Sequence, residues 1–581
     1  MQPEDGCEMP SLTMTASSPR LDSSSPEAPR SAFQSPAGLA IIVLALLAWL
    51  PFLNQAFTID DTNFLAMAAH VWPRPLRLYD FRINWLGEEQ RAFDILANPP
   101  LGPWYLALVS RVARGREWVF HLSYWPFLVL TLAGAYRLGR RFAREQGPLW
   151  TMLWTAAAPG LVVAGHAVMS DLPLLACYVL GAALTIDAFD QDKPGFAMGA
   201  GFFAGLSALC RYSGMTIIPL LLLYALLNRV RVRLSLPALA AALVPIGAWT
   251  IASYEVYGRV HWLTMAGFEG QALAAGDIVQ KLFYQLTCLA LVIAPAPLIV
   301  LMSDQGLRKS TRIGVGMGAF LAAGLVLQPW LPHIRTAGSV VLLGAGMAGA
   351  GAIGVVIARA IHSGNAAPVW RVRNSDQADE FFLGCWILGI LSFNLYLVFA
   401  SVRYTLLLLV PTVLLLQRVF TAPLRARRVR WPATAVSFVL AILLSVSDQQ
   451  LAGLYRDYAA TLPAAAQSRW FTGHWGWQYY MERMGAKAVS RSSALKPGDE
   501  IVTPMMPFPQ NLPQAAKLEF IARNYVPTRL WLRTLTRNGA ACFYSNGVAE
   551  GDLPFSVWLP FGISNEPQEV FTRWKVVDAT Q

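Results

Sequence analysis

The chain has 581 residues, of which 55% are hydrophobic and 14% are charged, and its mean hydropathy is +0.42. Soluble domains carry nearer ~25% charged residues, so this composition excludes a soluble globular enzyme and indicates a polytopic membrane protein. The net charge of +11 does not indicate nucleic-acid binding, because the basic residues form no single patch interleaved with aromatic residues.

The N-terminal segment, residues 1–37, is rich in Ser and Pro and is typical of a disordered tail. The apolar run at 38–57 begins too far from the N-terminus for an ordinary signal peptide, so we expect an uncleaved membrane anchor. Further apolar runs follow, each suited to one bilayer crossing. They bring the total to about 13 transmembrane helices, the later ones near 118–136, 148–165, 172–189, 196–210, 213–228, 236–254, 279–301, 313–330, 338–358, 380–400, 404–420 and 431–447.

Arginine-rich loops indicate how these helices are oriented. If the tail is cytoplasmic, the loops near 137–147, 229–234, 303–312, 359–378 and 418–430 are cytoplasmic too. Basic residues are concentrated in these loops, whereas the loops on the other side carry few. The positive-inside rule predicts this asymmetry. We therefore expect a multi-pass protein of the bacterial inner membrane whose outer loops face the periplasm.

The first outer loop, residues 57–117, contains an amphipathic stretch at 99–115. Apolar side chains form one stripe along it, and Arg111 and Arg114 lie on the opposite side. Such a pattern is typical of a helix that lies in the membrane interface. Counting the stretch as a crossing would move the arginines of 137–147 to the outside, so we expect a juxtamembrane helix here.

The last part of the chain, residues 448–581, differs in composition from the preceding 38–447. It mixes turn signals with short strand-like runs, and an odd number of crossings places it outside. We expect a small periplasmic α/β domain that starts with a helix near 479–484. The predicted fold class is thus an all-α polytopic membrane protein followed by this domain.

Three polar features are predicted at the outer ends of helices, on one side of the membrane. They are Asp60-Asp61 after the first crossing, His166 and Asp171 in HAVMSDLP, and Arg403 in SVRYTLLLLVP. Two carboxylate sites and one cation around an outer cavity suit transfer to an acceptor with loss of an anionic leaving group. A carboxylate takes the proton of an acceptor hydroxyl, and a guanidinium group stabilises a departing phosphate.

Each feature also has a purely structural interpretation. Asp60 and Asp61 fit solvated loop charges at a helix exit, and Asp171 before Leu-Pro fits a helix N-cap. Arg403 and Tyr404 fit an interfacial anchor. His166 fits an interfacial polar residue. The shared side and the order of the features favour the functional interpretation.

These motifs resemble the GT-C superfamily of integral-membrane glycosyltransferases. The resemblance is to the branch, similar to glycosyltransferase family 39, that includes lipid A aminoarabinose transferase, protein O-mannosyltransferases and Rgt-like enzymes. It covers about residues 38–420 and rests on the acidic pair, on NPPLGPWYLAL, on MSDLPLLA and on SVRYTLLLLVP. The stretch FTGHWGWQYYMERMG at 471–485 also looks like a segment at the membrane-to-periplasm junction of bacterial relatives.

The resemblance implies a GT-C fold, a polyprenyl-phosphate-linked sugar donor and inversion at the anomeric carbon. It implies that Asp60 is the catalytic base, that Asp61 is its neighbour or contributes to acceptor binding, and that Asp171 orients a substrate. It also implies that Arg403 meets the donor phosphate. Related enzymes often carry Lys or His where this chain has Asn98, so Arg403 or Arg211 is expected to supply the cation. We include His166 and Tyr404 among the expected binding residues.

The leading functional hypothesis is therefore a glycosyltransferase that moves a sugar from a polyprenyl-phosphate donor to a hydroxyl or phosphate of a lipid, glycan or protein acceptor. The alternative is a transporter or a flippase for lipid-linked sugars. A transporter should carry ionisable residues near mid-span and internal repeats, and this sequence shows neither. The sequence leaves open whether a divalent metal takes part, and no cofactor is implied with certainty.

Overall fold

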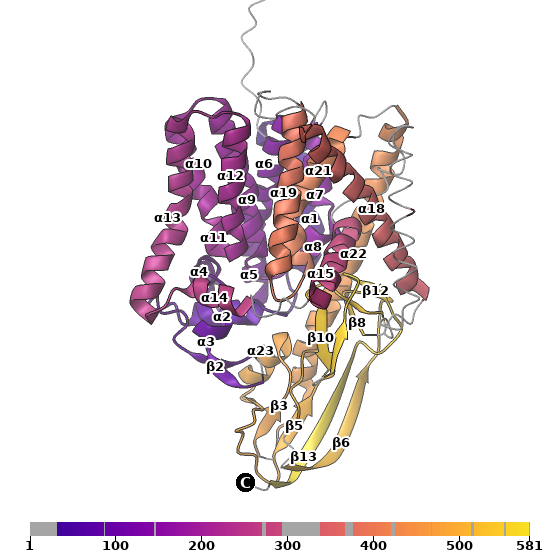
Figure 1. Ribbon diagram of the computed structural model, residues 1–581. Coiled ribbons are helices and arrows are strands. Elements are labelled where there is room, and N and C mark those ends of the chain that lie inside the picture. The colour runs from indigo at the N-terminus through magenta and orange to yellow at the C-terminus, as the bar shows by residue number, and fades with distance from the viewer. Residues whose placement is uncertain are drawn as a thin grey trace, which may run out of the picture.

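The computed structural model describes residues 32–85, 87–143, 147–269, 275–292, 316, 337–365, 376–419, 424–465, 467–512, 516–537, 539–550 and 553–579. It consists of a large helical bundle with a smaller β-rich region at one end (Figure 1). Residues 1–31 of the predicted tail (1–37) and the predicted crossing at 313–330, apart from residue 316, lie outside this description.

Long helices form the bundle. They are α1 (Pro36–Trp49), α6 (Trp125–Phe142), α7 (Gly147–Ala156), α8 (Pro159–Gly165), α9 (Asp171–Asp190), α10 (Pro194–Gly205), α12 (Ile217–Leu227), α13 (Val232–Tyr257), α15 (Ala275–Val292), α18 (Ala337–Asn365), α19 (Asp376–Tyr396), α21 (Leu409–Val419) and α22 (Leu424–Thr461). Within the described part of the chain, six helical segments are long and apolar enough to cross a membrane, and the bent pair α7–α8 makes up to seven. Shorter apolar helices lie at the predicted crossings near 38–57, 196–210, 213–228 and 279–301. The chain is thus a multi-pass membrane protein.

Helix α9 is the centre of the bundle, and 89% of its most apolar stretch is buried. A helix that is apolar on all sides is expected to be enclosed by other helices, and α6 and α10 pack on α9. The most apolar stretch of α13 is only 33% buried, so α13 lies at the periphery. Close packing of α10 on α13 depends on small residues, because Gly201 and Gly205 face the backbone carbonyls of Ala238 and Ala242.

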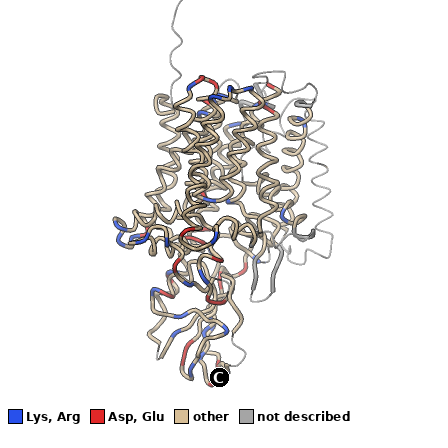
Figure 2. Tube along the Cα trace, turned by 60° about the vertical axis from the view of Figure 1, so that its left-hand side comes forward, with Lys and Arg blue, Asp and Glu red and all other residues tan. Residues whose placement is uncertain are grey.

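Charged side chains lie mainly at the two ends of the bundle, and the band between them is almost free of charge (Figure 2). At the end away from the β-rich region, arginines pair with acidic residues of neighbouring helices. Arg137 and Asp187 are 2.7 Å apart, and Arg141 lies 2.7 Å from Asp190 and 3.0 Å from Asp379. The arginines of the predicted loop near 137–147 therefore lie at this end, whereas the predicted loop near 303–312 lies outside the described residues.

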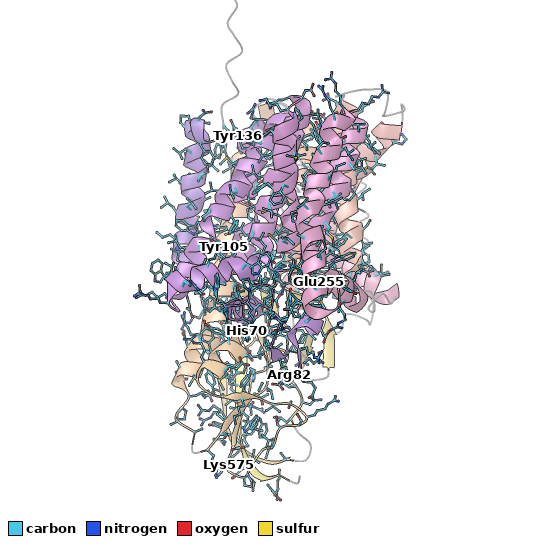
Figure 3. All side chains as sticks on the ribbon, turned by 90° about the vertical axis from the view of Figure 1, so that its left-hand side faces the viewer. His70, Arg82, Tyr105, Tyr136, Glu255 and Lys575 are labelled. Atoms are coloured by element: carbon cyan, nitrogen blue, oxygen red, sulfur yellow. The ribbon has the colours of Figure 1, made fainter. Side chains whose placement is uncertain are left out.

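The segment between α1 and α6 covers the opposite end. It contains α2 (Asp61–Ala69), β1 (Arg82–Asn84), β2 (Glu89–Arg91), α3 (Ala92–Ile95), α4 (Leu101–Ala113) and α5 (Glu117–Ser123). The predicted interfacial stretch corresponds to α4, which is not among the candidate spans of the described chain. His70 and Tyr105 of this segment lie between Tyr136, near the far end of the bundle, and Lys575 in the β-rich region (Figure 3).

The C-terminal region contains helix α23 (Trp475–Arg483) and short strands around one larger sheet. The sheet has five strands in the order β4-β3-β5-β13-β6. They are β4 (Lys487–Ala488), β3 (Arg469–Phe471), β5 (Glu500–Thr503), β13 (Glu569–Ala579) and β6 (Ala516–Val526). Smaller pairs are formed by β7 (Leu532–Arg533), β8 (Leu535–Thr536), β9 (Ala541–Cys542), β10 (Gly547–Glu550), β11 (Leu553–Ser556) and β12 (Gly562–Ile563).

Contacts of α22 and α23 help to join this region to the bundle. Helix α22 continues past residue 448 to Thr461, and Tyr455 donates a hydrogen bond to the buried carboxylate of Glu569 at 2.9 Å. On the other side, a Cβ at Gly476 would lie 2.2 Å from the carbonyl oxygen of Phe57, so only glycine allows α23 to pack this closely. The hydroxyl of Tyr480 also accepts a hydrogen bond from the N–H of Phe57 at 2.9 Å. These contacts hold α23 against the chain just before Asp60.

A pair of substitutions on α10 tests the packing of α10 on α13. The added methyl of Gly201→Ala would lie 2.2 Å from the Ala238 carbonyl oxygen, and overpacking of this kind costs about 1–3 kcal/mol. Gly199→Ala is the matched control, because nothing lies within 4 Å of its added methyl. We expect Gly201→Ala to lower the melting temperature in detergent and Gly199→Ala to leave it unchanged or raise it. Equal melting temperatures would contradict this packing.

Candidate active site

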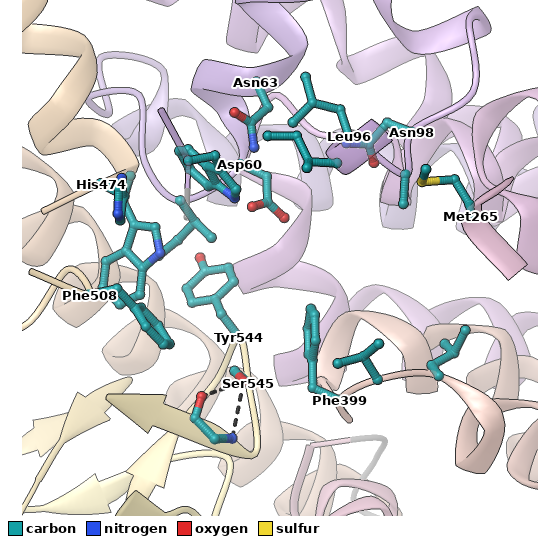
Figure 4. Close-up of a pocket in the computed structure, with 18 of the residues that line it drawn as sticks. Asp60, Asn63, Leu96, Asn98, Met265, Phe399, His474, Phe508, Tyr544 and Ser545 are labelled. Carbon is teal, nitrogen blue, oxygen red and sulfur yellow. Dashed lines mark hydrogen bonds between the residues drawn. The ribbon is translucent and has the colours of Figure 1, made fainter. Parts of the chain in front are cut away.

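A cavity of about 1550 Å³ lies between the bundle and the C-terminal region. Asp60 lies in its wall, with Leu96, Asn98 and Met265 on one side and His474 and Phe508 on the other (Figure 4). Tyr544 and Ser545 of the C-terminal region line it as well, next to Phe399. The wall therefore combines segments from the first outer loop, the late helices and the C-terminal region.

Four predicted residues form one ionic network in or beside this cavity. Arg403 donates from Nη2 to Asp60 at 2.7 Å and from Nη1 to Asp171 at 3.5 Å. Asp171 also accepts a hydrogen bond from Arg211 at 2.6 Å. Arg403 and Asp171 are buried, with 3% and 2% of their side chains exposed, whereas Asp60 is 26% exposed. The motifs predicted on one side of the membrane are thus in direct contact.

The C-terminal region holds the chain around Arg403 in place. The N–H of Val402 donates to the carbonyl of Phe543 at 3.2 Å. Asn546 forms two bonds with Ala400, one from its backbone N–H at 2.8 Å and one to its side-chain oxygen at 2.6 Å. The side chain of Ser401 caps the short helix α20 (Val402–Thr405) through the N–H of Arg403. These contacts orient Arg403 toward both carboxylates.

Asp61 has a different role from its neighbour Asp60. It is fully buried and does not line the cavity. Its carboxylate accepts hydrogen bonds from the N–H of Thr58 at 2.9 Å and from the N–H of Val168 at 2.7 Å. Burial raises the pKa of Asp61 well above its ordinary value, and the two N–H groups partly offset that effect. Asp61 therefore joins the first outer loop to the loop before Asp171.

His166 also lies outside the cavity lining. Its ring stacks on Phe52 at 4.3 Å and meets Trp49 edge-on at 4.9 Å. Neither ring nitrogen has a hydrogen-bond partner among the described residues. Its position does not support the expected role in substrate binding, because it is enclosed by aromatic residues, and we assign it to packing.

The other predicted binding residues line the cavity. Arg211 packs over the ring of Tyr404, with its guanidinium carbon 4.2 Å from the ring centre. Asn98 lines the cavity too, and its backbone carbonyl accepts a hydrogen bond from the Tyr79 hydroxyl at 2.5 Å. Asn98 thus reaches the cavity as expected but adds no charge to it.

Several lining residues were not predicted from the sequence. Lys281 of α15 is buried in the cavity wall and donates to the Leu397 carbonyl at 2.7 Å. A lone lysine at the edge of an apolar run was the available signal, since ionisable groups in such runs are usually functional. Tyr544 packs near Arg403 and donates to Asp448 at 2.8 Å, and no sequence signal links it to the site.

Within the described part of the chain, no preformed divalent-metal site is present. Asp60 and Asp171, the acidic members of the network, are both engaged by guanidinium groups. Among the described residues, no group of three or more His, Cys, Asp or Glu side chains is arranged to hold a metal ion. We therefore derive no chemical step through a metal.

Comparison with known proteins gives one family match. The model of the dolichyl-phosphate-mannose-protein mannosyltransferase family matches residues 97–254. The matched stretch contains Asn98, Asp171 and Arg211 and does not reach Asp60 or Arg403. No curated protein sequence matches the chain.

Several solved structures are similar to the chain at low sequence identity. The oligosaccharyltransferase AglB from Archaeoglobus fulgidus, in complex with an inhibitory peptide and a dolichol-phosphate, is 14% identical, with a TM-score of 0.43 over 78% of this chain and 64% of that one. ArnT from Cupriavidus metallidurans, bound to undecaprenyl phosphate, is 14% identical, with a TM-score of 0.39 over 81% and 94%. Arabinofuranosyltransferase AftD from mycobacteria is 13% identical, with a TM-score of 0.39 over 95% and 41%.

The chain spans about two thirds or less of the length of the archaeal oligosaccharyltransferase structures. The family match over residues 97–254 confirms that this chain resembles the GT-C membrane glycosyltransferases, as its sequence motifs predict.

Proposed function

We propose that this protein is an inverting glycosyltransferase that moves a sugar from a polyprenyl-phosphate donor to a hydroxyl or phosphate acceptor. The observation that carries the proposal is the partly exposed carboxylate of Asp60, which lies 2.7 Å from Arg403 in the wall of a large cavity at one end of the membrane bundle. This arrangement supports the proposal, because a carboxylate that can act as a base lies beside a cation that can bind a phosphate.

In the proposed reaction, the acceptor oxygen attacks the anomeric carbon of the donor from the face opposite the phosphate. The bond between that carbon and the phosphate oxygen breaks, and polyprenyl phosphate leaves with both bonding electrons. For a hydroxyl acceptor, Asp60 takes the proton. The leaving phosphate is acidic enough to depart without an acid.

The charges of this network indicate which further residue would help to bind a phosphate. The carboxylates of Asp60 and Asp171 together offset the charges of Arg403 and Arg211. An incoming phosphate therefore needs further positive charge, and Lys281 lines the same cavity. We propose that Arg403, Arg211 and Lys281 stabilise the donor phosphate and the charge that grows on it, while Asn98 and Tyr404 complete the binding surface.

The apolar part of the wall supports a lipid-linked donor. Leu96 and Met265 line the side of the cavity that also contains Asn98 (Figure 4), and Ile95 lines the cavity as well. Phe393, Leu397 and Phe399 of the late helices line it too. We propose that the polyprenyl chain leaves the cavity across these residues into the bilayer, and that the cavity faces the periplasm of a bacterium.

A direct test of the activity uses purified full-length protein and a panel of polyprenyl-phosphate sugars. Asp60→Asn should lower transfer on the order of 10²-fold or more, because the amide cannot take the proton. Binding of the donor should largely survive. The control is Asp80→Asn, an exposed carboxylate of the same outer segment that pairs with Arg77. Release of polyprenyl phosphate is the readout, and near-normal transfer by Asp60→Asn would exclude its role as the base.

Asp61→Asn should act on stability instead. An amide offers one acceptor oxygen where the carboxylate accepts two backbone N–H groups, so one of them loses its partner. A buried unpaired N–H costs about 1–3 kcal/mol. We expect a lower melting temperature for Asp61→Asn than for Asp60→Asn. An inactive Asp61→Asn variant of normal stability would assign the catalytic proton to Asp61.

The proposed orientation is tested at Ser492, which is exposed in the C-terminal region. Ser492→Cys, in a chain with Cys7→Ser, should react with a membrane-impermeant thiol reagent in intact spheroplasts. A cysteine placed at Asp192, exposed at the opposite end of the bundle, should react only after lysis. The reverse pattern would place the cavity on the cytoplasmic side.

A further inference from the structure

The C-terminal side of the cavity is lined by aromatic residues. Trp85, His474, Trp475 and Phe508 all contribute to this wall. The rings of Trp85 and His474 are 5.6 Å apart, and those of Trp475 and Phe508 are 5.5 Å apart. Asp60 lies between this wall and the apolar, membrane-side part of the cavity (Figure 4). We call Trp85, Trp475 and Phe508 the aromatic wall.

Backbone strain is concentrated at this cavity. Ile59, Trp475 and Phe508 line it with φ angles of +45°, +61° and +48°. Large side chains rarely adopt this left-handed conformation, because it strains the backbone. Among non-glycine residues of the described chain, four others have positive φ. Strain of this kind persists where a precise side-chain position matters, so it points to binding at the aromatic wall.

Hydrogen bonds fix the two loops that carry Trp475 and Phe508. The N–H of Gly473 donates to the side-chain oxygen of Gln510 at 2.6 Å. The N–H of His474 donates to the Pro507 carbonyl at 2.7 Å. Because α23 also packs on Phe57 through Gly476, the aromatic wall has a fixed position relative to Asp60. A preformed wall of this kind lowers the entropy cost of binding.

Polar side chains surround the aromatic wall. Glu88, Ser490, Arg491 and Asn511 line the same cavity. Flat aromatic faces next to such groups match a sugar ring, whose C–H bonds pack on the rings while its hydroxyls bond to the polar side chains. The pKa of His474 is lowered to about 4 by burial, so this residue adds a neutral ring at neutral pH.

A peptide acceptor fits this wall less well. An extended peptide binds most readily by adding a strand to an open sheet edge, and the edge strand nearest the cavity is β4. The chain after β4 is already occupied, because the Val489 carbonyl accepts hydrogen bonds from Asn84 at 3.0 Å and Gln510 at 2.8 Å. The N–H of Val489 donates to the Phe471 carbonyl at 2.9 Å.

We propose that the aromatic wall binds a sugar ring of the acceptor, so that the molecule receiving the transferred sugar is itself a carbohydrate. This inference rests on the proposed glycosyltransferase function. Packing against the aromatic wall would direct a hydroxyl of that ring toward Asp60. A free oligosaccharide and a glycolipid headgroup share this chemistry.

The product of transfer distinguishes these acceptors. Full-length protein is incubated with a labelled polyprenyl-phosphate sugar and with three acceptor fractions of cell envelope: soluble oligosaccharides, glycolipids and proteins. Label is expected in the soluble glycans, or in the glycolipids, where it partitions into organic solvent. The label should resist protease treatment. Incorporation into the protein fraction alone would overturn the proposal.

Substitutions in the aromatic wall provide a second test of the proposed sugar site. Trp85 is half-buried, so Trp85→Ala should fold and should raise the acceptor KM on the order of tenfold, with the donor KM little changed. Trp475→Phe is a second variant that keeps a ring in the buried position. Trp531→Ala is the matched control, because Trp531 is 72% exposed in the same region and does not line the cavity. Acceptor KM values equal to wild type in both wall variants would overturn the proposal.

A binding measurement separates this inference from the proposed function. Saturation-transfer NMR with chitotriose and maltotriose needs no donor or turnover. If the signal of at least one trisaccharide weakens in Trp85→Ala but not in Trp531→Ala, the result supports a sugar site at the aromatic wall. This holds even if the protein accepts no donor. If the protein turns over a lipid-linked donor but the NMR signals are equal in all variants, the proposed function stands and the proposed sugar site is overturned.

Discussion

The buried contact of Arg403 with two carboxylates is the interaction on which the site depends. It joins Asp60 of the first outer loop to Asp171 at the start of the central helix α9, and Asp171 in turn holds Arg211. Removing the buried Arg403 would cost about 3–5 kcal/mol, because the buried Asp171 would lose one of its cations, whereas Asp60 is partly exposed. The network therefore fixes the ends of several helices while it keeps the Asp60 carboxylate at the cavity surface.

The sequence predicts the membrane fold and most of the network, because both follow from local patterns. Apolar runs define the crossings, and arginines at one end of the bundle define their common direction. Asp60, Asp171 and Arg403 are then predicted on one side. Their direct contact requires the tertiary structure, because Asp60 and Arg403 are 343 residues apart in the chain.

Side-chain direction limits prediction within the acidic pair. Asp60 and Asp61 are adjacent in the sequence, but the chain turns into α2 between them, so one carboxylate faces the cavity and the other faces backbone N–H groups. His166 shows the same limit, because its neighbours Trp49 and Phe52 come from the first crossing. Trp475, Phe508 and Tyr544 reach the cavity from distant loops of the C-terminal region. No spacing in the sequence indicates that they meet there.

The hydrogen bonds between residues 400–402 and residues 543–546 also bear on how the protein is made. A ribosome completes the bundle long before it reaches Phe543, so the nascent chain holds Arg403 without the strand-like support that later orients it. The orientation of Arg403 is completed only when residues 543–546 have docked at the same end of the bundle. Folding of the C-terminal region is therefore a precondition for the geometry of the site.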